Sequence, residues 1–187
     1  MNSNYTIQIA GLTRVLPICP VNENLSIAAF VMFSDVEITI ASAKELLKKA
    51  PEHDVIVTAE SKGIPLAYEM ARQENKKYIL ARKSSKLYMQ DPFSVKVKSI
   101  TTQSEQTLYL DKSEAVYLKG KRVLITDDVI STGESLRAME VLIGRAGGII
   151  AGKCFVLAEG DAANRDDIIF LEELPLFFNR KGNTAWQ

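Results

Sequence analysis

The sequence predicts an α/β protein with a mainly parallel central sheet flanked by helices. Two observations predict this class: short apolar runs rich in β-branched residues alternate with segments of helical periodicity, and turn residues separate the two kinds of segment. Strands that alternate with helices favour a parallel sheet covered on both faces. The length of 187 residues suits a single core. We therefore expect residues 1–187 to form one domain, with about residues 1–40 contributing a small N-terminal hood.

The first 40 residues depart from this alternation. Gly11, Pro17 and Pro20 break their short apolar runs, which predicts irregular strands and turns. A helix is expected next, over residues 41–50. It should end before Pro51, because a residue that precedes proline is disfavoured in the helical conformation.

The alternation is regular from residue 54 onward. Pro65 suits the first turn of a helix, and Gly147–Gly148 suits the end of one. Residues 95–110 alternate in polarity and predict an antiparallel pair around a mobile tip. The other expected elements are strands over residues 54–59, 77–81, 123–126, 149–158 and 168–170, and helices over residues 64–73 and 134–145.

Composition argues against several classes of protein. Lysine plus arginine and aspartate plus glutamate number 23 each, and this zero net charge argues against a dedicated nucleic-acid binder. No apolar run approaches the roughly 20 residues of a membrane helix. Cys19 and Cys154 are too few for a disulfide scaffold. We interpret both as reduced thiols of a cytoplasmic protein.

The single histidine, His53, limits the chemistry further. A Ser-His-Asp triad would have to use it, and a histidine-rich zinc site is excluded. His53 lies in the polar connection formed by residues 51–54, just before an expected strand. We therefore expect it to be an ordinary surface residue.

Residues 123–136 carry the strongest indication of function. An apolar strand leads to Asp127 and Asp128, and the short loop Ser131–Gly133 then opens a helix. Ligands of open α/β sheets bind outside the carboxyl ends of the strands. A helix N-terminus presents free N–H groups and a partial positive charge, so it suits a phosphate. Gly133 allows close approach of the backbone, and nearby hydroxyls add donors.

The loop alone cannot hold a ligand. One helix end contributes about 0.3–2 kcal/mol to anion binding, whereas micromolar affinity requires about 8 kcal/mol. Asp127 and Asp128 must therefore also bind something, such as sugar hydroxyls or a magnesium ion. Because successive strand residues point to opposite faces, both carboxylates can serve one site only if the strand ends there. The alternative is that they merely cap the strand and that Ser131-Thr132 is only a helix N-cap.

The segment of residues 123–136 resembles the signature of type I phosphoribosyltransferases, which bind phosphoribosyl pyrophosphate (PRPP). The resemblance implies their fold, with a hood and a mobile antiparallel loop. It also implies that Asp127 and Asp128 contact the ribose 2- and 3-hydroxyls and are catalytic. Glu134 departs from the small residue or glycine that is common in the family. The residues expected to cradle the 5-phosphate are Ser131, Thr132, Gly133, Glu134 and Ser135.

A second segment, Ala59–Gly63, resembles the pyrophosphate loop of adenine phosphoribosyltransferases, with Lys62 in place of the usual arginine. The family also has an Arg-Lys pair at the strand end that Arg82 and Lys83 occupy here, and Arg82 is a further catalytic candidate. The alternative is that these side chains only form a solvated surface. The residues expected at the pyrophosphate are Glu60, Ser61, Lys62, Gly63, Arg82, Lys83 and Lys86.

The segments that bear on the identity of the base resemble two different groups of purine enzymes. Residues 31–36 resemble the hood element of the adenine enzymes, which implies that Met32, Phe33 and Ser34 lie at the base; core packing is the alternative for Phe33. Residues 174–178 also resemble the C-terminal strand of these enzymes. However, Thr102 stands where they carry a loop glutamate, with Glu105 a little beyond. The segments 81–83 and 99–103 are closer to the xanthine enzymes.

The resemblance implies transfer of 5-phosphoribosyl from PRPP to a purine, with adenine favoured, and release of pyrophosphate. Mg²⁺ would bridge PRPP hydroxyls and pyrophosphate, with Asp127 and Asp128 as candidate ligands. Residues 89–106 would close over the site and exclude water. A homodimer is expected, without nucleic-acid or membrane partners. The alternatives are a xanthine or hypoxanthine enzyme, a PRPP-sensing regulator without catalysis, and a pyrimidine or orotate enzyme of the same fold.

Overall fold

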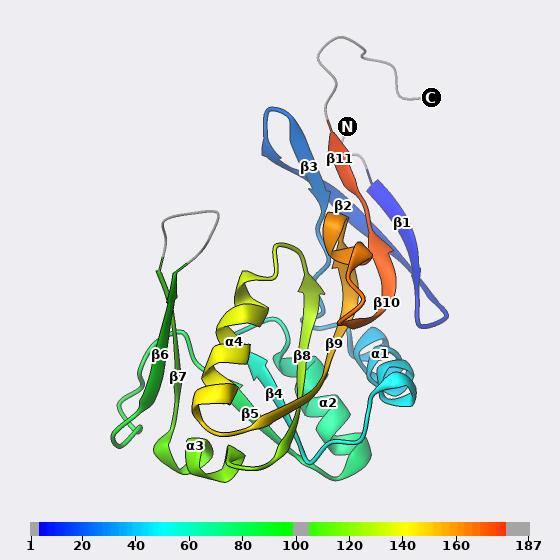
Figure 1. Cartoon of the computed structure of the whole chain (residues 1–187). Coiled ribbons are helices and arrows are strands. Elements are labelled where there is room, and N and C mark those ends of the chain that lie inside the picture. The colour runs from blue at the N-terminus through cyan, green and yellow to red at the C-terminus, as the bar shows by residue number, and fades with distance from the viewer. Residues whose placement is uncertain (1–3, 99–104, 179–187) are drawn as a thin grey trace.

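A five-stranded parallel sheet forms the centre of the molecule in the computed structural model, which describes residues 4–98 and 105–178 (Figure 1). The spatial order of its strands is β10-β9-β8-β4-β5, and every neighbouring pair is parallel. The predicted parallel sheet is therefore confirmed. The strands are β4 (Val55–Ala59), β5 (Lys77–Ala81), β8 (Arg122–Ile130), β9 (Ile149–Glu159) and β10 (Ile169–Leu174).

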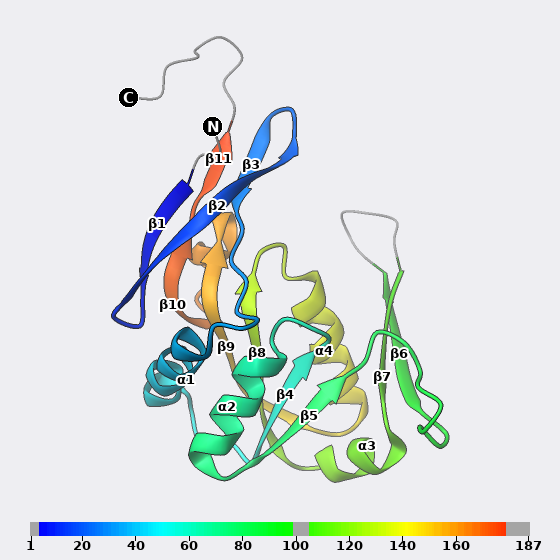
Figure 2. The same cartoon turned by 180° about the vertical axis from the view of Figure 1, so that it is seen from behind.

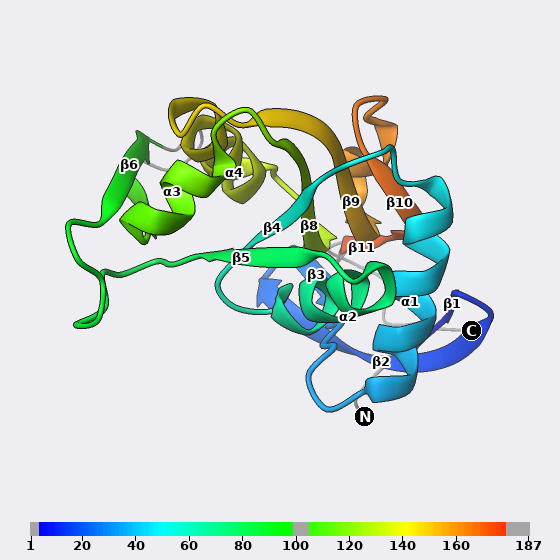
Figure 3. The same cartoon turned by 90° about the horizontal axis from the view of Figure 1, so that it is seen from below.

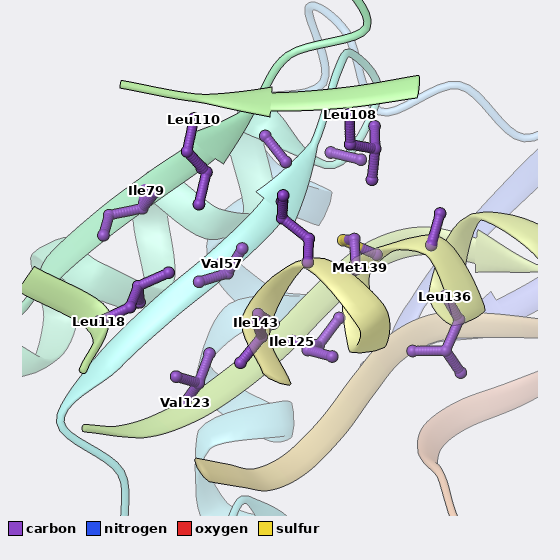
Figure 4. Close-up of a cluster of buried hydrophobic side chains, with 14 of the residues drawn as sticks. Val57, Ile79, Leu108, Leu110, Leu118, Val123, Ile125, Leu136, Met139 and Ile143 are labelled. Atoms are coloured by element: carbon purple, nitrogen blue, oxygen red, sulfur yellow. The ribbon is translucent and has the colours of Figure 1, made fainter. Parts of the chain in front are cut away.

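One face of this sheet packs against α4 (Glu134–Arg145), α3 (Lys112–Leu118) and the hairpin of β6 (Phe93–Lys98) and β7 (Glu105–Leu110). The apolar stripe of α4 meets side chains of β8 and β4, and the hairpin adds Leu108 and Leu110 (Figure 4). The labelled core residues in that view are fully or almost fully buried. Burying one such side chain contributes about 1.5–3 kcal/mol.

The opposite face is covered by α1 (Val36–Lys49) and α2 (Ile64–Glu74) (Figure 2). Seen from below, the sheet lies between α4 on one side and α2 on the other (Figure 3). Helices on both faces explain why strands such as β4 are apolar throughout, since all of its residues are buried. Among the described residues, none of the helices combines the length and apolar character needed to span a membrane.

The N-terminal residues form strands, as expected, but in an antiparallel sheet that includes the C-terminal end of the described chain. Its order is β1-β2-β3-β11. Figure 1 shows this sheet beyond the carboxyl ends of β8 and β9, so it overhangs the edge where α/β proteins bind ligands. The elements are β1 (Asn4–Ile9), β2 (Leu12–Asn22), β3 (Leu25–Ala28) and β11 (Leu176–Phe178), and the 3-10 turn η1 (Gly160–Asn164) follows β9.

Most predicted boundaries agree with the structure to within a few residues. The helix predicted over residues 41–50 begins earlier, at Val36, because Asp35 caps it and accepts a hydrogen bond from the N–H of Ile38 at 3.1 Å. Helix α3 was not predicted. A capping box between Asp111 and Glu114 begins it, and this pattern is readable in the sequence.

The expectation that His53 is a surface residue is wrong. Its relative exposure is 3 %. Nδ1 lies 2.9 Å from the carbonyl oxygen of Pro51, and Nε2 lies 2.9 Å from a carboxylate oxygen of Glu74, outside hydrogen-bond geometry. Within the described residues, only Nδ1 therefore has a hydrogen-bond partner, in the connection before β4, whereas Nε2 lies beside a carboxylate at the end of α2.

Candidate functional site

The cavity at the centre of the site opens where two neighbouring strands part. The described ladder between β4 and β8 ends at Val57 and Ile125, whereas β8 stays paired with β9 as far as Ile130. A cavity of about 200 Å³ lies at these carboxyl ends. Its polar lining comes from Glu60, Ser61, Lys62, Lys83, Asp127, Asp128, Ser131, Thr132, Gly133, Glu134 and Ser135, and its apolar lining from Ala59, Val129, Ile130, Leu136, Met139 and Phe155.

The expectation that the strand ends after Thr126 is wrong, because β9 offers β8 a partner for four more residues. Asp127 and Asp128 therefore lie within a strand, and adjacent strand residues point to opposite faces. Both nevertheless line the cavity. We attribute this to its position along the edge of β8 that β4 leaves unpaired, rather than above one face of the sheet.

Asp128 is the most unusual polar residue of the site. Its relative exposure is 2 %, and its Oδ2 has no hydrogen-bond partner within the described part of the chain. The nearest cation is the ammonium group of Lys62, whose Nζ lies 3.4 Å from Oδ2. A buried carboxylate oxygen without a donor is costly. This geometry therefore favours a ligand that supplies hydroxyl groups or a cation.

Asp127 packs directly against the loop of residues 60–63. A Cβ built on Gly63 would lie 2.5 Å from Asp127 Oδ1 and would also collide with the hydroxyl of Thr58. Only glycine fits at this contact. Oδ1 also accepts a hydrogen bond from the N–H of Asp128 at 2.9 Å. Burial, and then the neighbouring carboxylate of Asp128, raise the pKa of Asp127 well above its usual range.

Three of the four basic residues expected at the pyrophosphate gather around Glu60, whereas Lys62 lies at Asp128. The carboxylate of Glu60 accepts a hydrogen bond from Arg82 Nη1 at 2.9 Å and one from the backbone N–H of Lys83 at 2.9 Å, and Lys86 Nζ lies 3.6 Å away. The Lys83 N–H and then Arg82 hold the pKa of Glu60 below its usual range. Glu60 thus organises the cations, a role that its acidic side chain suits better than direct contact with an anion.

Arg82 also connects this cluster to the β6–β7 hairpin. Its N–H and carbonyl oxygen both pair with the backbone of Tyr109, at 2.9 and 2.8 Å. The base of the hairpin is therefore attached to the end of β5. Residues 99–104, which include the Thr102 position, lie outside the described residues, and so does the side chain of Glu105.

The loop of residues 131–133, which is predicted to bind a phosphate, leads directly into α4. Gly133 is the N-cap of α4 with φ of +77°, a conformation that favours glycine. Gly133, rather than Ser131 or Thr132, is therefore the N-cap residue, although Thr132 Oγ1 accepts a long hydrogen bond from the N–H of Glu134 at 3.5 Å. The next N–H groups, of Ser135 and Leu136, have no acceptor within the helix, so they can donate to a ligand.

The residues expected at the base are not gathered in the cavity lining. Met32 is 1 % exposed and belongs to the core beneath the hood. Phe33 is 46 % exposed, so the alternative that it packs in the core is wrong. Ser34 has a left-handed backbone conformation with φ of +69°. Sequence reasoning also missed Phe155 and Met139, which contribute to the apolar part of the cavity lining.

A comparison with protein families gives a match over the region that contains the cavity. A family model described as phosphoribosyl transferase domain matches residues 34–175. The chain belongs to the phosphoribosyltransferase family. The predicted family is thereby confirmed, and the matched segment contains all three predicted anion-binding segments.

Several curated phosphoribosyltransferases are similar to the chain. An adenine phosphoribosyltransferase of Cenarchaeum symbiosum is 32% identical over 129 residues, which cover 68% of this chain and 73% of the relative. A hypoxanthine/guanine phosphoribosyltransferase of Methanocella paludicola is 35% identical over 58% of this chain and 53% of its own length. A xanthine phosphoribosyltransferase of an Exiguobacterium species is 33% identical over 65% and 62%. The matches thus span between about half and three quarters of these relatives.

Solved structures agree on the fold. The crystal structure of adenine phosphoribosyltransferase from Thermoanaerobacter pseudethanolicus has a TM-score of 0.69 and 22% identity, and the alignment covers 84% of this chain and 95% of that one. The adenine enzyme of Giardia lamblia, solved with 9-deazaadenine, has a TM-score of 0.60 and 18% identity over 91% of this chain and 93% of its own. The predicted type I phosphoribosyltransferase fold is confirmed.

Proposed function

We propose that the protein transfers the 5-phosphoribosyl group of PRPP to a purine base and releases pyrophosphate. One observation carries the proposal: the buried Oδ2 of Asp128 has no donor among residues 4–98 and 105–178, and Asp128 lines a cavity between two loops suited to anions. PRPP has the matching chemistry, because it carries ribose hydroxyls between a phosphate and a pyrophosphate. The family membership of the chain supports this assignment.

Each part of PRPP has a counterpart in the cavity. The 2- and 3-hydroxyls donate to Asp127 and Asp128, which supplies the donor that Oδ2 lacks. The 5-phosphate accepts hydrogen bonds from residues 131–135 at the start of α4. The pyrophosphate binds Lys62 and the basic cluster around Glu60, which consists of Arg82, Lys83 and Lys86.

Magnesium fits this site only together with substrate. Within the described residues, no group of three or more histidine, cysteine, aspartate or glutamate side chains could cage a metal ion. Asp127 and Asp128 provide two carboxylates, and Mg²⁺ commonly takes its remaining ligands from substrate oxygens and water. When bound, the ion would neutralise charge on the leaving pyrophosphate.

The proposed reaction breaks the bond between the anomeric carbon and a pyrophosphate oxygen and forms a bond from that carbon to a purine nitrogen. Positive charge develops on the sugar in the transition state. The buried carboxylates lie where they would stabilise it, and the basic cluster stabilises the negative charge on the leaving group. The two loops hold the ends of PRPP apart and orient the anomeric carbon.

Adenine is the base that we propose. The names of several relatives and structural neighbours favour it, whereas xanthine and hypoxanthine/guanine enzymes among the relatives make those bases the alternative. Because Met32 is buried, it is the exposed Phe33 and the backbone of residues 32–34 that are available to a base in this element.

The direct test incubates the protein with PRPP, Mg²⁺ and each purine in turn, with orotate as the pyrimidine control, and measures pyrophosphate release. Release with adenine, and not with orotate, is the expected result. No release with any base, although PRPP binds, would instead identify a regulator.

An Asp128→Asn variant tests the site itself. It removes the charge at almost constant volume, and the loss of charged hydrogen bonds should raise the Kd for PRPP about 100-fold. Asp161→Asn, on the exposed part of η1, is the matched control and should bind normally. Unchanged affinity of Asp128→Asn would refute the assignment of the site.

A further inference from the structure

Arg165 lies beside the phosphate loop although it belongs to a different part of the chain. It follows η1, and its Nη1 lies 3.0 Å from the point that a Cβ on Gly133 would occupy. Gly133 is the N-cap of α4 and lines the cavity. Arg165 does not line the cavity itself, so its charge acts across Gly133. This side chain was not among the residues predicted for the site.

The other edge of the Arg165 guanidinium is held by Asp167. Nε and Nη2 donate to the two carboxylate oxygens at 2.9 and 2.8 Å. Asp167 also accepts from Lys153, which donates to Glu140 of α4 at 2.7 Å. The four side chains are neutral as a group, but the positive end of the group is nearest Gly133. Since Glu140 is part of α4, the network also fixes Arg165 relative to that helix.

The loop that would bind the phosphate lacks a basic side chain of its own, so the charge of Arg165 would complement it. Residues 127–136 contain no lysine or arginine, and they include three carboxylates, of which Glu134 begins the helix. Within this segment, only backbone N–H groups and hydroxyls would offset these negative charges at a phosphate bound to the start of α4. The orphaned, buried Oδ2 of Asp128 in the same cavity independently indicates that a ligand binds there.

We propose that Arg165 supplies the positive charge of the 5-phosphate subsite and that Asp167 is its positioning residue. The inference rests on the proposed function, because it takes the anion to be the phosphate of a ribose 5-phosphate group. Because the Arg165 side chain is partly exposed and already paired with Asp167, we expect its loss to weaken phosphate binding by only about tenfold.

The test compares Arg165→Gln with wild type and with Arg145→Gln, which removes the same charge from the exposed far end of α4. Calorimetric titration measures binding of three probes: PRPP with Mg²⁺, ribose 5-phosphate and pyrophosphate. Arg165→Gln should weaken PRPP and ribose 5-phosphate about tenfold and leave pyrophosphate unchanged. Asp167→Asn should weaken the same two probes to a smaller extent, and Arg145→Gln should weaken none.

The pattern across the probes separates a binding role from a structural one. Equal binding of ribose 5-phosphate by Arg165→Gln and wild type would overturn the inference and leave the proposed function intact. A parallel loss of pyrophosphate binding, with a lower melting temperature, would overturn it in favour of a structural role. A wild-type protein that binds neither PRPP nor ribose 5-phosphate would overturn both proposals.

Discussion

The two loops that we propose to bind anions differ in their local charge. Around Glu60 the cations are close in sequence, and an internal carboxylate holds Arg82 and Lys83 in place. The loop of residues 131–135 has no cation of its own and presents the backbone of Gly133 at a helix N-terminus. Ligand binding near Glu60 should therefore be sensitive to the loss of a charge. Ligand binding at residues 131–135 should be sensitive to blocked access to the backbone and to the loss of Arg165, which is distant in sequence.

The close contact between Gly63 and Asp127 should be the most sensitive to substitution. In Gly63→Ala the new Cβ would collide with Thr58 and Asp127. We expect a loss of about 1–3 kcal/mol in the free energy of unfolding and weak binding of both PRPP and pyrophosphate. Urea unfolding and calorimetric titration measure the two effects.

Gly144→Ala is the matched control for that substitution. Gly144 lies in α4, and a Cβ there would meet nothing within 4 Å. This change should raise the free energy of unfolding by up to about 1 kcal/mol, because alanine favours the helix. Equal stability of the two variants would contradict the packing of the loop against Asp127.

Removal of one cation should distinguish the loops directly. Arg82→Gln breaks the ion pair with Glu60 and removes one charge from the pyrophosphate side. Affinity for pyrophosphate should fall about tenfold, as expected for one charged hydrogen bond, whereas affinity for ribose 5-phosphate should not change. Inhibition or direct titration by each anion checks this, with the exposed Lys112→Gln as the control. A loss for both anions would show that the two subsites are not independent.

A further expected effect concerns the pH dependence of stability and arises at Asp127, next to the loop of residues 60–63. Its pKa is raised in the folded protein by burial and by Asp128, so the folded state holds this proton more tightly than the unfolded state. The free energy of unfolding of the ligand-free protein should therefore fall as the pH rises above about 4, the ordinary value of an aspartate. The loss is about 1.4 kcal/mol for each unit by which the two pKa values differ.

Chemical denaturation at several pH values measures this dependence. Asp127→Asn should flatten the profile between about pH 4 and neutrality, and binding of PRPP with Mg²⁺ should release protons. A stability that rises over this range in wild type, and is unchanged in the variant, would contradict the raised pKa.

Much of the fold followed from local patterns. The boundaries of α4 and β5 were predicted without error, because Gly147–Gly148 end the first and turn residues flank the second. The end of β8 was not predictable in this way. It depends on β9, which supplies hydrogen-bond partners beyond Thr126, and a partner strand leaves no mark in the sequence of the strand that it extends. His53 was misjudged for the same reason, since α2 covers it.

The sequence by itself determined the family, most of the strands and helices, and the residue types of the two loops, because these depend on neighbours along the chain. The tertiary structure alone decided which contacts each of those residues makes. In the folded protein Glu60 accepts a hydrogen bond from Arg82, and Asp128 Oδ2 is buried with no donor in the described part of the chain. Met32 lies in the core, and Arg165 lies next to Gly133. Burial and charge pairing depend on which segments pack against each other, and local sequence patterns do not specify this packing.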